Sequence, residues 1–114
     1  MVIRNFSTEQ GAATPHGIKA AKMYDRDHGV IMHLTLAPGE ALKPHATPVD
    51  VVFYVVAGAP TVQIGGERRQ VGPDGLVESP QDIVHCLYNE TDAPVRALVM
   101  KLPRPTAPTR MVGD

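Results

Sequence analysis

Glycine and proline recur at short intervals along the whole chain, and they constrain the fold more than any other feature. The 114 residues contain 10 glycines and 11 prolines, scattered rather than clustered. The runs between them are short and either alternate or are continuously apolar, which is typical of β-strands, and none is long enough for a convincing helix. We therefore expect one all-β domain with many turns, large enough to form a core without disulfides.

The segment from Val30 to Leu36 predicts a strand with one core face. Its even-numbered residues are all apolar, so they are expected to point inward together. His33 lies on the opposite face and is predicted to point away from the interior, toward solvent or a second subunit.

The unbroken apolar run from Val51 to Val56 predicts a strand with both faces covered. One face is expected to lie in the core. The other is expected to pair with a second copy of the chain in a homodimer, because isologous pairing buries the same patch twice. The alternative is that an N-terminal or C-terminal arm of the same chain covers it. This outer face comprises Val52, Tyr54 and Val56.

Charge and cysteine content exclude several classes of function. The net charge of −1 and the dispersed basic residues give no case for a nucleic-acid partner or an anionic membrane. No stretch approaches the roughly 18 apolar residues of a membrane span, and the first residues do not resemble a secretory signal. The single cysteine, Cys86, is consistent with a reducing compartment, so we predict a cytoplasmic protein.

Two segments carry histidine, glycine and proline at characteristic spacings. Gly39–Gly58 contains His45, and Pro80–Asn89 contains His85. The spacing resembles the two motifs of the cupin family, the first reading G, five residues, H-x-H, three or four residues, E, six residues, G. The second reads G, five residues, P-x-G, two residues, H, three residues, N. The matching positions are Gly39, His45, Gly58, Pro80, His85 and Asn89.

The resemblance implies an all-β cupin fold, the double-stranded β-helix or jelly-roll barrel. The barrel is expected at 28–102. The mixture of polar and small residues at 1–27 predicts an N-terminal arm with an edge strand, and the proline-rich segment 103–114 predicts a tail that lies extended on the surface. The resemblance also implies dimerisation, which supports the homodimer expected above.

The chemistry of the motifs departs from the family pattern. Thr47 replaces the second histidine and Val51 replaces the glutamate, so only His45 and His85 carry over from four family metal ligands. Two histidines alone hold a metal weakly. Glu78 is the first candidate for a third ligand.

The remaining candidates for the third ligand are His33, Asp50 and water, in that order. Asp50 would need a bulge at Pro48–Val49 to face inward. We therefore expect at most one divalent ion of Fe, Mn, Ni or Zn, at low occupancy. His16 and His28 are predicted to be an exposed loop histidine and a turn histidine with no role.

Two functions of different class remain open. In the first, the barrel binds a small, partly hydrophobic or anionic molecule, because the loss of the glutamate makes the pocket more apolar and less negative. In the second, the protein is a metal-dependent enzyme of dioxygenase or isomerase type that uses both histidines and an unorthodox third ligand. The predicted ligand-binding residues are His45, Thr47, Val51, Phe53 and His85.

Overall fold

The computed structural model describes residues 1–9, 11 and 16–112. This part of the chain contains ten β-strands and no helix, and therefore has no helix that could span a membrane. The strands are β1 (Lys19–Arg26), β2 (Gly29–Leu36), β3 (Ala41–Ala46), β4 (Asp50–Ala57), β5 (Thr61–Ile64), β6 (Glu67–Gln70), β7 (Leu76–Ser79), β8 (His85–Tyr88), β9 (Val95–Leu102) and β10 (Arg110–Met111).

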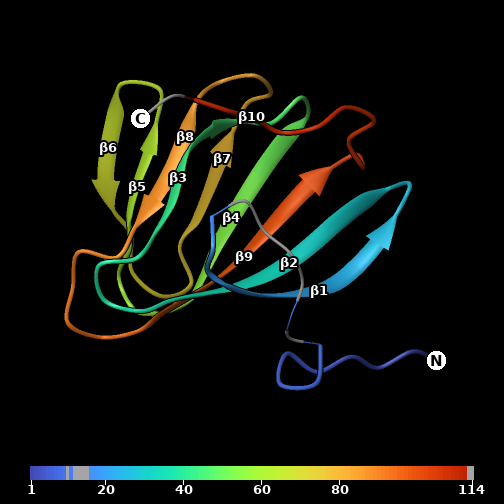
Figure 1. The fold of residues 1–114 in the computed structure, drawn as a ribbon, viewed down its shortest axis with the longest axis horizontal. Helices are drawn as coiled ribbons and strands as arrows, with labels where there is room; N and C mark the ends of the chain where they lie inside the picture. The colour runs from blue at the N-terminus through green and yellow to red at the C-terminus, as the bar shows by residue number, and fades with distance from the viewer. Residues whose placement is uncertain (10, 12–15, 113–114) are drawn as a thin grey trace.

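The strands form two five-stranded antiparallel sheets (Figure 1). One sheet has the order β1-β2-β9-β4-β7 and the other has the order β10-β3-β8-β5-β6. The hydrophobic core takes residues from both sheets, so it lies between them. The predicted all-β jelly-roll fold is confirmed.

The inward faces of β2 and β4 are those that the alternation predicts. Leu34 and Leu36 on β2 belong to the core, as do Val51 and Phe53 on β4. Successive side chains of a strand point to opposite faces, so the face of one residue determines the faces of its neighbours. The two strands are also linked through β9, which pairs with both of them and lies between them.

The outer face of the first sheet is covered in part by the N-terminal segment. His33 points away from the barrel interior, as predicted, but it is buried. The ring of Phe6 lies 4.1 Å from the ring of His33, and the Arg96 guanidinium stacks on Phe6 at 4.8 Å. Arg96 Nη2 lies 3.2 Å from His33 Nε2. In this structure, the same chain therefore covers His33.

The C-terminal segment returns to the barrel. After β9 the chain crosses to the second sheet, where β10 pairs with β3 and Met111 lies opposite His45. Pro105 and Thr109 line the cavity described below. The segment 103–112 thus forms part of the site, whereas the sequence predicts only an extended surface tail.

Candidate functional site

A bulge in β3 determines where His45 points. Leu42 pairs with Leu87 on β8, and His45 pairs with His85, so three steps along β3 match two along β8. The extra residue reverses the alternation, and Leu42 and His45 both face the cavity although they are three positions apart. Pro44 lies in this bulge, where its missing N–H removes no ladder hydrogen bond.

His45 and His85 form the centre of a buried hydrogen-bond chain. Their Nε2 atoms are 3.0 Å apart. His45 Nδ1 lies 2.6 Å from the Lys43 carbonyl oxygen, and His85 Nδ1 lies 2.6 Å from Ser79 Oγ. All ring nitrogens of both histidines therefore have a partner within the protein.

The carbonyl of Lys43 fixes the direction of this chain. A carbonyl only accepts, so the neutral His45 carries its proton on Nδ1 and its Nε2 is an acceptor. His85 then donates from Nε2 to His45, and the Ser79 hydroxyl donates to His85 Nδ1. Both imidazoles are neutral in this arrangement, and each of the three hydrogen bonds has one donor and one acceptor.

Burial keeps these imidazoles neutral. Desolvation is the main cause that lowers the pKa of His85 to about 3, and the charge of His45 adds to it. Desolvation also lowers the pKa of His45, against an opposing contribution from its bond to the Lys43 carbonyl. Neither side chain therefore carries a positive charge near neutral pH.

His16 is a site residue that the sequence analysis missed. Its ring lies 4.6 Å from the ring of His45, and its Nδ1 accepts a 2.8 Å hydrogen bond from the Lys43 backbone N–H. It is half-buried, and desolvation lowers its pKa to about 4. The predicted exposed loop histidine is therefore wrong. Nothing local marks His16, because its partners lie on a strand 27 positions away.

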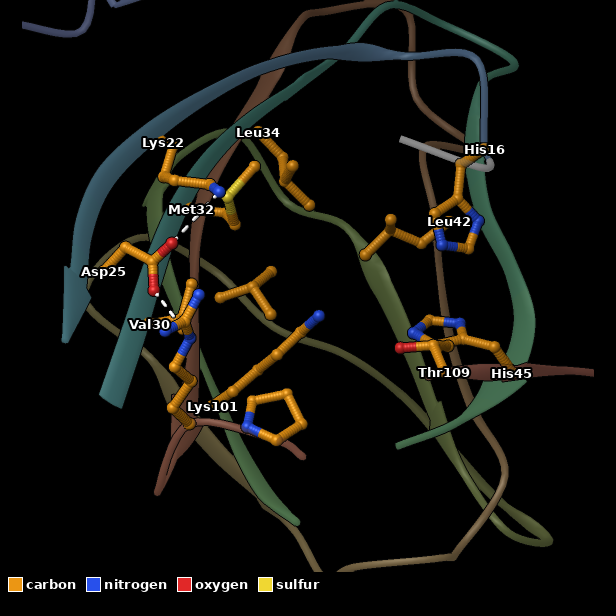
Figure 2. Close-up of a pocket in the computed structure, with 13 residues that line it drawn as sticks. His16, Lys22, Asp25, Val30, Met32, Leu34, Leu42, His45, Lys101 and Thr109 are labelled. Atoms are coloured by element: carbon orange, nitrogen blue, oxygen red, sulfur yellow. Dashed lines mark hydrogen bonds and ion pairs between the residues drawn. The ribbon is translucent and has the colours of Figure 1, made fainter. Parts of the chain in front are cut away.

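The open cavity lies in front of His45 and has a volume of about 350 Å³. Figure 2 shows His16, Leu42 and His45 on one side and the strands of the first sheet on the other. The wall formed by that sheet is largely apolar, with Val30, Met32, Leu34 and Val99.

Lys101 points from this apolar wall into the cavity (Figure 2). It lies on β9 directly between Val30 on β2 and Val51 on β4. Val51 occupies the position where the family motif has glutamate, so Lys101 is beside that position. Among the residues that the structure describes, its amine has no hydrogen bond or ion pair. Desolvation, followed by the charge of Lys22, lowers the pKa of Lys101.

Charged side chains lie at the edge of the cavity. Asp25 lies between two cations, with Lys22 Nζ 3.1 Å from one carboxylate oxygen and Arg104 Nε 3.1 Å from the other. The hydrogen bond from Lys22 is the main cause that lowers the pKa of Asp25. One carboxylate faces two cations, so this edge has an excess of positive charge.

The five predicted ligand-binding residues differ in whether they border the open cavity. Only His45 borders the open cavity, whereas His85, Thr47, Val51 and Phe53 are each exposed by 1% or less. The edge of the Phe53 ring faces His85, with centroids 5.1 Å apart. Thr47 Oγ1 is buried and has no hydrogen-bond partner among the described residues.

The predicted third metal ligands do not reach the histidine pair. Glu78 is exposed and pairs with Val52 on the outer face, so its selection as first candidate is wrong. Its neighbour Ser79 takes the inward position instead, as strand alternation requires. Asp50 is also exposed and accepts a hydrogen bond from the Gln81 N–H. His33 lies on the outer face.

The residues around His45 do not fit a divalent metal ion. Thr47 and Val51 supply no negative charge, and the Nε2 atoms of His45 and His85 are hydrogen-bonded to each other. Lys101 places an amine in the same cavity, and its charged form repels a cation. In residues 1–9, 11 and 16–112, no three His, Cys, Asp or Glu side chains are grouped for metal binding.

The chain belongs to the cupin domain family, whose model matches residues 32–101. Among solved structures it is similar to the TT1209 protein from Thermus thermophilus, with 25% identity and a TM-score of 0.79. That alignment covers 92% of this chain and 100% of the other. No curated protein matches the sequence.

Two further structures share the fold at lower identity. The polyketide cyclase RemF from Streptomyces resistomycificus is 21% identical with a TM-score of 0.81, over 100% of this chain and 87% of that one. A predicted oxalate decarboxylase from Thermotoga maritima is 13% identical with a TM-score of 0.81, over 90% and 99% of the two chains. At these identities the similarity establishes the fold alone.

Proposed function

We propose that this cupin binds a small, partly apolar carboxylate in the barrel cavity. The observation that carries the proposal is the amine of Lys101, which projects into an apolar cavity without an anionic partner among the described residues. A half-buried cation without a counter-ion is unfavourable, so an incoming carboxylate gains a charge-assisted hydrogen bond there.

The remaining surface of the cavity suits the apolar part of such a ligand. Val30, Met32 and Leu34 form a continuous apolar wall, and a volume of about 350 Å³ is within the range of small-molecule sites. The excess positive charge around Asp25 attracts an anion toward the opening.

The metal-dependent enzyme is the weaker candidate. It needs a third ligand, and Glu78 and Asp50 both point away from the histidine pair. A loosely held metal on His45 and His85 would also displace the hydrogen bond between their Nε2 atoms. Within the described residues, no feature of the cavity favours dioxygenase or isomerase chemistry over simple binding.

Calorimetry with phenylacetate tests the binding proposal. We expect Lys101→Met to weaken binding by about tenfold, equivalent to one charge-assisted hydrogen bond. Lys19→Met is the matched control, because Lys19 is exposed and is not among the residues that line the cavity. Equal affinity of the wild type and Lys101→Met would contradict the proposal.

Metal analysis distinguishes the two functions. Protein purified without chelators is expected to hold far less than one metal ion per chain, and a His45→Ala, His85→Ala double variant is expected to hold no less. Stoichiometric metal in the wild type that the double variant loses would support the enzyme instead.

We further propose a cytoplasmic homodimer formed through Val52, Tyr54 and Val56. These side chains are half-buried on the outer face of β4. In size-exclusion chromatography, Tyr54→Asp is expected to convert a dimer to a monomer. Tyr24→Asp on β1 is the control, because Tyr24 is exposed on a different strand. A monomeric wild type would refute the dimer.

A further inference from the structure

We propose that Lys101 forms an imine with the carbonyl group of a 2-oxo acid bound in the cavity. This inference rests on the proposed ligand site and adds a covalent step to it. Three observations support it: the amine projects into the cavity, apolar side chains flank it, and it has no anionic partner in the described part of the chain.

The position of Lys101 exposes its amine to a ligand. Val30 and Val51 flank it on the neighbouring strands, so its stem runs along an apolar surface and its amine projects into the cavity (Figure 2). A lysine in such surroundings usually finds a carboxylate. The carboxylate that lines this cavity, Asp25, is already held by Lys22 and Arg104.

The groups that face Lys101 favour its neutral, nucleophilic form. His16, His45 and His85, whose lowered pKa values keep them neutral near pH 7, offer the amine no counter-charge. Lys22 adds a repelling positive charge. Desolvation acts in the same direction and is the largest cause that lowers the pKa of Lys101.

The step balances without any oxidant or cofactor. The nitrogen lone pair of Lys101 attacks the carbonyl carbon, and the electron pair of the C=O bond moves to oxygen, which takes up the proton that the nitrogen loses. The resulting carbinolamine loses its hydroxyl group as water, and the C=N bond forms.

A 2-oxo acid offers a carboxylate to pair with the charge of Lys101 and a carbonyl group to react with its amine. Its carboxylate is attached directly to the carbonyl carbon, so it stays close to the nitrogen after the imine forms and pairs with the protonated imine. Its apolar remainder can lie against Met32 and Leu34. An uncharged aldehyde would react without this electrostatic gain.

Reductive trapping tests the inference. The intact protein is incubated with phenylpyruvate and sodium cyanoborohydride at neutral pH, and the modified lysines are located by peptide mass spectrometry. We expect Lys101 to be modified faster than Lys19, Lys22 and Lys43, because its lowered pKa raises its neutral fraction and the bound 2-oxo acid holds its carbonyl group beside the amine. The comparison is made within one protein and needs no variant.

Two controls make the result decisive. Lys101→Met should lose the rapid modification while retaining the melting temperature of the wild type, and Lys43→Met should keep it. Similar rates at all four lysines, or no modification of Lys101, would overturn the imine. Phenylacetate has no carbonyl group, so its binding reports on the proposed function independently of this outcome.

Discussion

The two walls of the cavity differ in how their polar groups are satisfied. On the wall formed by β3 and β8, His45 and His85 have protein partners at every ring nitrogen. On the opposite wall, Lys101 on β9 has none among the described residues. The polar groups of the first wall are satisfied within the protein, whereas the amine on the second wall is not. We therefore infer a structural role for the motif histidines and propose the binding role for Lys101, which the sequence did not predict.

Removing His85 should break the first wall. His85→Ala deletes a fully buried ring and leaves the Ser79 hydroxyl and His45 Nε2 without their partner. We expect the free energy of unfolding to fall by about 2 to 4 kcal/mol, as for other large-to-small changes in a core. Urea denaturation measures this loss. Ser79→Ala, which removes one hydrogen bond and little volume, should cost less; an equal cost would contradict the proposed chain.

Acid should weaken the same wall. The pKa of His85 is lowered to about 3 and that of His16 to about 4, whereas both titrate near 6.5 in the unfolded chain. Their contribution to stability is therefore complete above pH 6.5 and decreases toward pH 4 and 3, because the unfolded chain binds protons that the folded chain excludes. Urea midpoints measured between pH 7.5 and 4.5 should fall, and less steeply in His16→Gln. Equal slopes would exclude His16 from the site.

Removing the amine of Lys101 should leave the second wall intact. Lys101→Met keeps a side chain of similar length and eliminates a desolvated amine that has no partner in the described part of the chain. We expect the free energy of unfolding to stay the same or rise by up to about 1 kcal/mol. Thermal and urea denaturation without ligand measure this effect. A loss greater than that range would indicate a structural role for the amine.

Glu78 should matter to neither wall. Glu78→Gln changes an exposed residue on the outer face, so we expect stability within about 0.5 kcal/mol of the wild type. Metal content and phenylacetate affinity should also be unchanged. A change in metal content would indicate that Glu78 is a metal ligand and that the register of β7 differs from the one described here.

The strand pattern determined the fold and the direction of most core side chains. Alternation from Val30 to Leu36 and the apolar run from Val51 to Val56 report which face of a strand is inside, because the period of two is a local property of the backbone. The spacing of the motifs also identified His45 and His85, which the structure places directly opposite each other on the paired strands β3 and β8.

Tertiary structure alone decided what surrounds those histidines. The bulge in β3 turns His45 inward, His16 reaches it from a distant segment, and Lys101 is brought beside Val51 by the pairing of β9 with β4. Each of these contacts joins residues far apart in the chain. Local periodicity carries no information about which strands become neighbours, so the charge and the second wall of the cavity could be known only from the folded molecule.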